Sequence, residues 1–144
     1  AESTADILSV ARKAQQGYDI VVGNRFIKKM IRGYPPLKYC ANRLCNLTTR
    51  LLFRIPTSDI TNAFKAYSRN LVRGLDLKSR GYSVFLELPL RAYLNSALKL
   101  GEVPVGHTAT QKSHGLRIFK DGIAYCQILL ELLFYRQKRV SSPR

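Results

Sequence analysis

The chain has 144 residues, a length that suits one domain, and its 46% content of hydrophobic residues excludes a disordered chain and a collagen-like repeat. Lysines and arginines number 24 against 9 aspartates and glutamates, and the resulting formal charge of +15 favours a polyanionic partner: nucleic acid, an anionic membrane face or a phosphorylated substrate. No uncharged apolar run of roughly 18 residues or more is present, so the sequence predicts no complete membrane-spanning helix.

A helix followed by a buried strand is predicted at the start of the chain. Residues 3–16 place apolar side chains at helical spacing, and Ser3 with Asp6 matches a capping box. Gly17 ends this helix. The next apolar run, Asp19-Ile-Val-Val-Gly23, is β-branched and typical of a buried strand. Helix, glycine turn and buried strand together indicate an α/β fold.

A basic loop is predicted directly after this strand, over residues 24–36. Open α/β sheets bind their ligands beyond the carboxyl ends of the strands. Arg25, which lies two residues past Gly23, is therefore a candidate anion-binding residue. The lysines at positions 28 and 29 are interpreted as solvated surface charge.

Residues 37–53 are predicted to form a helix flanked by two polar rows, of which one consists of Arg43, Arg50 and Arg54. Lys38, Asn42 and Asn46 follow one another at steps of four, which makes them neighbours on one face. This row directs an ammonium group and two amides at one patch. The alternative is a solvated amphipathic helix, on which the same residues contact only water.

Residues 57–67 read as a turn followed by a short strand. Asp59 and Thr61 are candidate site residues, and the alternative is that they satisfy backbone donors of the turn itself. A short helix is then expected over residues 70–77. Pro89 is placed in the first turn of a further helix that runs to Leu100, because proline is tolerated there. An edge strand over residues 102–105 follows.

The last segment, residues 121–144, is interpreted as an amphipathic basic juxtamembrane tail that follows a catalytic unit at residues 1–120. Its polar residues form one narrow stripe, and its apolar run is too short to cross a bilayer. Such a helix suits the surface of an anionic membrane. The alternative is a terminal helix that packs on the domain.

Four motifs occur in an order that resembles family 2 glycosyltransferases. Residues 17–26 read GYDIVVGNRF, similar to "GyDvVvGSRf", and residues 59–69 read DITNAFKAYSR, similar to "D-x-T-S-G-F-R-x-y-s-R". Residues 82–87 read YSVFLE, similar to "y-x-F-x-x-E", and residues 101–105 read GEVPV, similar to "i-x-E-V-P-I". The dolichol-phosphate mannosyltransferase-like branch, which comprises polyprenyl-phosphate glycosyltransferases, is the most similar. The resemblance covers residues 1–120.

The resemblance implies the C-terminal half of a GT-A domain, the Rossmann-like fold of nucleotide-diphospho-sugar transferases. It implies transfer of a sugar from a GDP- or UDP-sugar to a polyprenyl or dolichyl phosphate, with Mg²⁺ or Mn²⁺ on the leaving diphosphate. The metal ligands are expected mainly in a preceding half, because no Asp-x-Asp occurs in this sequence. The chain is accordingly expected to be a fragment that is inactive alone, with no metal-binding residues assigned within it.

Three residues take roles at the acceptor phosphate under this resemblance. Arg25 falls on the arginine of the "G-S-R" motif, which implies contact with the phosphate. Lys38 falls where the branch often has arginine, and Asn42 where it often has serine, both in the same pocket. Lysine in place of arginine keeps the charge but loses the bidentate fork.

The remaining assignments concern the sugar and its surrounding loop. Asp59 falls on the motif aspartate near the reacting sugar, which implies a catalytic role as base or orienting group, and Thr61 and Glu87 are either structural or part of the site. The branch has an "R-x-x-G-x-S-K" loop after the V-P-I strand, whereas this chain lacks the Ser-Lys pair. Lys112 and Arg117 are the candidate sugar-phosphate contacts there.

Two alternatives remain at this point. A family 2 transferase that acts on a glycan hydroxyl would need a true base at Asp59. A basic nucleic-acid-binding domain would explain the charge, but no helix-turn-helix, RNP-like or zinc signature is present. The favoured interpretation is a hexosyltransferase on the cytoplasmic face of a membrane, with an anionic membrane surface and no nucleic acid among its partners.

Overall fold

The computed structural model describes residues 2–27, 31–73, 75–95, 97–108 and 115–141. The chain is mixed α/β, as the sequence predicts. The helices and strands in chain order are α1 (Thr4–Gln15), β1 (Ile20–Asn24), β2 (Ile31–Arg32), α2 (Pro36–Phe53), β3 (Lys65–Tyr67), α3 (Arg69–Arg73), the 3-10 turn η1 (Gly81–Ser83), α4 (Val84–Asn95), β4 (Leu100–Pro104), β5 (His107–Thr108) and α5 (Gly115–Ser141).

The first helix and strand form for the reasons that the sequence gives. Ser3 caps α1, since its side chain accepts from the backbone N–H of Asp6 while the Asp6 carboxylate accepts from the backbone of Ser3. Gly17 then adopts a positive φ of 82° that ends the helix region. Every residue of β1 is buried, which confirms the predicted buried strand.

The main sheet has the strand order β3-β1-β4, with β1 antiparallel to β3 and parallel to β4. Val21 lies opposite Ala66 on one side and beside Gly101 on the other. A separate parallel pair, β2 and β5, lies in segments for which the sequence predicts loops. Strands of two residues carry no periodic pattern, so sequence reasoning has no means of finding them.

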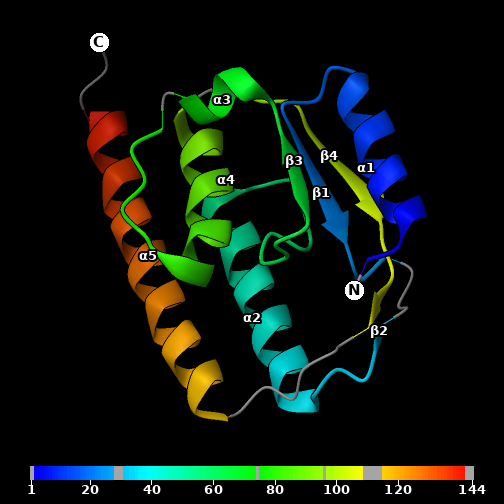
Figure 1. Ribbon diagram of the computed structural model, residues 1–144. Coiled ribbons are helices and arrows are strands. Elements are labelled where there is room, and N and C mark those ends of the chain that lie inside the picture. The colour runs from blue at the N-terminus through cyan, green and yellow to red at the C-terminus, as the bar shows by residue number, and fades with distance from the viewer. Residues whose placement is uncertain (1, 28–30, 74, 96, 109–114, 142–144) are drawn as a thin grey trace.

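Helices cover both faces of the main sheet (Figure 1). Ile20 and Val22 pack with Ala92 of α4 on one face. Successive strand residues point to opposite faces, so Val21 faces α1. Gly101 beside it has room for no side chain, because an added Cβ would lie 2.8 Å from the ring of Tyr18.

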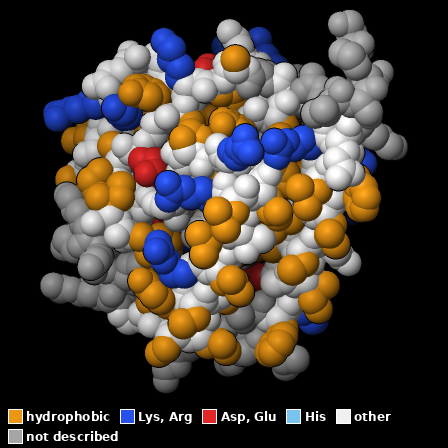
Figure 2. Space-filling model, turned by 180° about the vertical axis from the view of Figure 1, so that it is seen from behind, with side chains coloured by type: hydrophobic (Ala, Val, Ile, Leu, Met, Phe, Trp, Pro, Cys, Tyr) orange, Lys and Arg blue, Asp and Glu red, His pale blue; other side chains and the backbone are white. Residues whose placement is uncertain are grey.

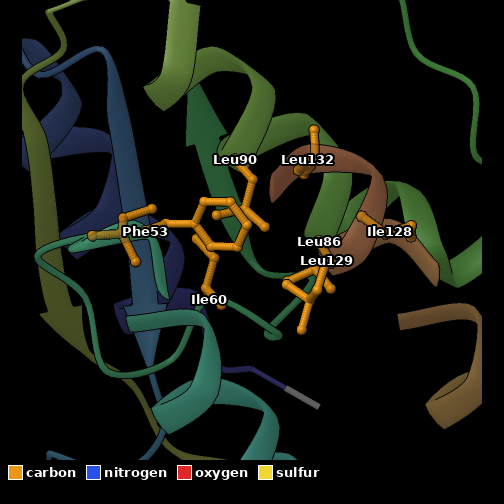
Figure 3. Close-up of a cluster of buried hydrophobic side chains, with 8 residues drawn as sticks. Phe53, Ile60, Leu86, Leu90, Ile128, Leu129 and Leu132 are labelled. Carbon is orange, nitrogen blue, oxygen red and sulfur yellow. The ribbon is translucent and has the colours of Figure 1, made fainter. Parts of the chain in front are cut away.

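The main apolar core lies between the sheet and three helices (Figure 3). It is formed by residues from the end of α2, the loop that follows it, α4 and α5: Phe53, Ile55, Ile60, Leu86, Leu90, Ile128, Leu129 and Leu132. Ile60 is 1% exposed. Because Ile60 is buried in the core, the loop that carries its two neighbours, Asp59 and Thr61, is held in place.

Helix α4 differs from its prediction. It begins at Val84 and ends at Asn95, so Pro89 lies inside it rather than in its first turn. Proline has no N–H for the carbonyl four residues earlier, which here is that of Phe85. Lys65 supplies the missing donor, since its Nζ lies 2.9 Å from the Phe85 oxygen. This long-range hydrogen bond compensates for an interior proline, and burial lowers the pKa of Lys65 to about 7.

Helix α5 crosses the predicted boundary at residue 120 and contributes to the core. Ile128, Leu129 and Leu132 are buried against α2 and α4, as expected for a helix that packs on the domain. Other apolar residues of α5 face outward, among them Ile123 at 60% and Phe134 at 64% exposure. Within the described residues, none of the helices combines the length and apolar character that crossing a bilayer requires.

Candidate anion-binding site

The site forms where β1 ends. Asn24, fully buried, donates from Nδ2 to Ser58 Oγ at 2.6 Å and to Glu102 Oε1 at 3.0 Å. Its Oδ1 accepts from the backbone N–H of Phe26 at 2.8 Å, which turns the chain after the strand. Asn24 thereby ties the end of β1 to the 57–59 loop and to β4.

Arg25 and Asp59 form a buried bidentate ion pair across this junction. The Arg25 Nη2 lies 2.7 Å from Oδ1 of Asp59, and Nε lies 2.8 Å from Oδ2. The backbone N–H of Arg25 also donates to Oδ2 at 2.9 Å. The side chains are 7% and 0% exposed. Burial alone would lower the pKa of Arg25, but the hydrogen bonds and charge of Asp59 outweigh it and raise the pKa.

Asn46 and Thr61 complete the shell around this carboxylate. Asn46 Nδ2 lies 3.3 Å from Oδ1 of Asp59 and 3.1 Å from Thr61 Oγ1, and its Oδ1 accepts from the backbone N–H of Thr61 at 3.1 Å. Thr61 Oγ1 lies 3.5 Å from Oδ1 of Asp59. Both Asp59 oxygens therefore already accept hydrogen bonds from several protein donors, so this carboxylate serves as an anchor for Arg25.

The outer side of Arg25 faces Tyr34, Lys38 and Asn42. Its Nη1 donates to the Tyr34 hydroxyl oxygen at 3.1 Å. Asn42 donates from Nδ2 to the same oxygen, and Lys38 Nζ stands 5.4 Å from the centre of the Tyr34 ring. The row Lys38, Asn42 and Asn46 thus faces the site, as the step of four predicts, and not bulk water alone.

The cations and the carboxylates of this cluster have different partners. The carboxylates of Asp59 and Glu102 accept hydrogen bonds from several protein donors, whereas Arg25 Nη1 and the Lys38 ammonium group both lie at Tyr34. Lys65 lies close enough for Asp59 to raise its pKa and for Arg25 to lower it. Cations that lie close together in a buried or half-buried position are the arrangement that an incoming anion stabilises.

Glu87 lies in a different network. Its carboxylate accepts a hydrogen bond from Arg91 Nε. It also accepts from the backbone N–H of Lys78 at 3.0 Å and from the backbone N–H of Ser79 at 2.7 Å. Burial would raise the pKa of Glu87, but these hydrogen bonds lower it to about 2. Of the two roles considered for Glu87, this geometry supports the structural one.

The two remaining candidates lie outside what the structure describes. Lys112 falls in the undescribed segment 109–114, and of Arg117 only the backbone, within α5, is described. Sequence reasoning missed Tyr34 as a site residue and gave Asn46 no role of its own. Asn46 was signalled by its place in the Lys38 row, whereas nothing in the sequence marked Tyr34 beyond its position just before α2.

The described residues supply no metal centre. Within the described parts of the chain, no three His, Cys, Asp or Glu side chains come close enough to hold a metal ion. The implied Mg²⁺ or Mn²⁺ therefore has no fitting donor set among these residues.

Comparison with known proteins gives a distant relative of this chain. No family model matches the chain. The chain is 29% identical over 104 residues to polyprenol monophosphomannose synthase of Mycolicibacterium smegmatis, an alignment that covers 69% of this chain and 38% of that protein. The chain therefore spans well under half of the length of this relative.

Proposed function

We propose that this chain is the acceptor-phosphate part of a glycosyltransferase that moves a sugar from a nucleotide-sugar to a polyprenyl phosphate. The observation that carries this proposal is the cluster of donors formed by Arg25, Lys38 and Asn42 at Tyr34, in which the buried Asp59 holds Arg25 in place. The similarity to a polyprenol monophosphomannose synthase supports the same acceptor class.

The acceptor chemistry matches the groups present. A phosphate monoester is ionised near neutral pH, so its oxygen attacks the sugar carbon without a protein base while the bond to the nucleoside diphosphate breaks. What the protein supplies is charge and orientation for two anionic substrates that repel each other. Arg25 and Lys38 supply the charge, and Asp59 holds Arg25 in place.

A hydroxyl acceptor is less compatible with this geometry. Such an acceptor loses a proton in the reaction and needs a general base within hydrogen-bonding reach. Asp59 was the candidate for that base, but its two oxygens accept from Arg25, Asn46 and Thr61. The proposal therefore assigns Asp59 a positioning role at the acceptor phosphate.

The test is a transfer assay with the complete enzyme that contains this chain. Polyprenyl phosphate is expected to be used and unphosphorylated polyprenol to be rejected. Arg25→Ala is expected to reduce use of the phosphate acceptor by about 10- to 150-fold, the effect of losing a charge-assisted hydrogen bond. Lys38→Gln, at a half-buried position, reports on the same site without leaving Asp59 unpaired. Arg12→Ala, on the exposed side of α1, is the matched control.

Equal use of both acceptors would contradict the proposal, as would an Arg25→Ala enzyme with normal acceptor kinetics and impaired donor binding. The 144 residues on their own are expected to show no turnover, because the donor and metal motif Asp-x-Asp is not among them. Sustained product formation by the isolated chain with Mn²⁺, nucleotide-sugars and dolichyl phosphate would overturn that part.

The proposal includes a membrane surface as partner, at the cytoplasmic face where nucleotide-sugars are available. Helix α2 carries an outward apolar stripe in which every residue is more than half exposed: Leu37, Leu44, Leu47 and Leu51. Helix α5, packed beside it, adds Phe119, Ile123, Leu130 and Phe134. An apolar surface of this extent indicates an interaction site.

Charge and position favour an anionic bilayer as the occupant of this surface. Arg43, Arg50 and Arg54 are exposed on or just after α2, and basic residues add about 1 kcal/mol each near an anionic membrane. Figure 2 shows a face on which hydrophobic side chains are interspersed with many lysines and arginines and few carboxylates. Leu37 directly precedes Lys38, so the apolar surface begins next to the proposed phosphate site.

Co-sedimentation with vesicles tests this surface. The chain is expected to bind anionic vesicles, to bind neutral ones more weakly, and to lose most binding when Leu44 and Leu51 are both changed to Glu. The matched control changes Ile7 and Leu8 of α1, which are exposed to a similar degree, and is expected to leave binding intact. Unchanged binding of the α2 variant, or self-association of the chain through this face in sedimentation velocity, would contradict a membrane partner.

A further inference from the structure

Tyr34 connects all three residues assigned to the acceptor phosphate. Its hydroxyl oxygen accepts from Arg25 Nη1 at 3.1 Å and from Asn42 Nδ2. Its ring lies 5.4 Å from Lys38 Nζ and 5.8 Å from Arg25 Cζ, within the range of cation–π attraction. One half-buried side chain therefore contacts a guanidinium, an amide and an ammonium group that come from two different segments.

The two donors that meet at Tyr34 are of the kind that a phosphate oxygen accepts. Arg25 uses Nε and Nη2 for Asp59, so Nη1 is the group on its outer edge. Asn42 uses its Nδ2 on the same phenolic oxygen. Each of these two nitrogens carries two N–H groups, so a hydrogen bond to the Tyr34 oxygen does not use up the capacity of either to donate to an anion. Tyr34 thus holds both donors next to each other before an anion arrives, which lowers the ordering cost of binding.

The phenol remains protonated at this position. Burial raises the pKa of Tyr34, and this effect outweighs the opposing charge and hydrogen bond of Arg25. A neutral phenol does not repel an incoming phosphate, in contrast to a carboxylate or phenolate in the same place. Tyr34 thus offers an oxygen that accepts hydrogen bonds from protein donors, and it carries no negative charge.

We propose that Tyr34 is a positioning residue of the acceptor-phosphate site, which holds Arg25 Nη1 and Asn42 Nδ2 next to each other and borders Lys38 with its ring. This inference rests on the proposed function. It adds a residue that lies outside the four motifs, and a division of roles: Asp59 fixes the inner edge of Arg25 and Tyr34 fixes its outer edge.

Tyr34→Phe removes the oxygen and retains the ring. In a titration of the 144-residue chain with farnesyl phosphate, this variant is expected to bind roughly three- to tenfold more weakly than the wild type, the effect of one net hydrogen bond. Its thermal unfolding midpoint is expected to stay within the wild-type error, because the side chain is only half-buried. Tyr39→Phe is the matched control, since Tyr39 is an exposed tyrosine five positions further along the chain, in α2.

A second readout separates positioning from a general structural effect. In ligand-free protein, the side-chain amide resonances of Asn42 are expected to shift in Tyr34→Phe and to stay unchanged in Tyr39→Phe. Wild-type affinity of Tyr34→Phe, with weakened binding of Lys38→Gln, would overturn the role of Tyr34 and leave the proposed phosphate site in place. Failure of the wild-type chain to bind farnesyl phosphate would overturn the proposed site and the role of Tyr34 with it.

Discussion

The chain contains two buried arginine–carboxylate pairs, and they have different surroundings. Arg25 and Asp59 meet at the end of β1, with side-chain exposures of 7% and 0%. Arg91 and Glu87 meet one turn apart on α4, with exposures of 8% and 2%. By distance and burial alone the two pairs are nearly equivalent, so neither property indicates which of them binds a ligand.

The groups around each pair distinguish them. Arg91 also contacts Glu131 at 2.7 Å, and Glu131 contacts Lys78 at 3.0 Å, so two cations meet two carboxylates directly in that balanced network. In the Arg25 cluster, Arg25 Nη1 and Lys38 instead meet at the neutral phenol of Tyr34. Cations that already contact carboxylates stabilise the fold, whereas cations that meet at a neutral group are stabilised further by an anion. We therefore expect the Arg91 network to be structural and the Arg25 cluster to bind the anion.

The largest expected effect comes from neutralising each carboxylate in turn. Asp59→Asn should lower the free energy of unfolding by about 3–5 kcal/mol, because it leaves the buried Arg25 without its paired carboxylate. Glu87→Gln should lower it by less, because Arg91 keeps its ion pair with Glu131. Inorganic phosphate should restore part of the loss in Asp59→Asn, where an anion can reach Arg25, and none in Glu87→Gln.

Urea unfolding with phosphate, and with sodium chloride at matched ionic strength, measures this difference. Equal stabilisation of both variants by phosphate would show that the two networks do not differ in their affinity for anions. The absence of any phosphate effect on Asp59→Asn would contradict an anion site at Arg25.

Acid should affect the balanced network through Glu87. Its pKa of about 2 in the folded chain lies below the ordinary value of 4.5, so the unfolded chain binds the proton more tightly. Stability from Glu87 is therefore complete above about pH 4.5 and is lost as the pH falls toward 2, a loss of about 2–3 kcal/mol. Denaturant titrations across this pH range should show a shallower decline in Glu87→Gln than in the wild type. Parallel declines would contradict the assignment.

The smallest expected effect contrasts a lysine from each network. Lys78 and Glu131 are 63% and 43% exposed, so Lys78→Ala should lower the free energy of unfolding by less than about 1 kcal/mol. Phosphate binding should not change in that variant. Lys38→Ala should weaken phosphate binding with no comparable loss of stability. Weaker phosphate binding in Lys78→Ala, with unchanged binding in Lys38→Ala, would contradict the roles given to the two networks.

Short-range patterns predicted much of this arrangement. The apolar run before Gly23 predicted the buried strand. The carboxyl end of that strand predicted that Arg25 lies where a ligand binds. The step of four along residues 38–46 gave the helix face that reaches the site. These features depend on residues a few positions apart, for which strand and helix geometry is regular.

The features that the sequence did not reveal depend on contacts between distant residues. Pro89 is accommodated inside α4 because Lys65, 24 positions earlier, bonds to the Phe85 carbonyl. Asp59 accepts hydrogen bonds from Arg25, which lies 34 positions earlier in the chain. Tyr34 contacts Arg25 from nine positions further along the chain, and no periodic sequence pattern links the two residues. Such contacts are set by the packing of the whole domain, so a local pattern does not encode them.

The central claim is that the Arg25 cluster, and not the Arg91 network, receives the acceptor phosphate. Arginine Nε–H groups give separate signals in a ¹H–¹⁵N correlation spectrum, so both arginines can be followed in one titration of the chain with farnesyl phosphate. The account predicts saturable shifts of the Arg25 Nε and Asn42 amide signals, with the Arg91 Nε signal unmoved. Shifts at Arg91 with none at Arg25 would contradict it.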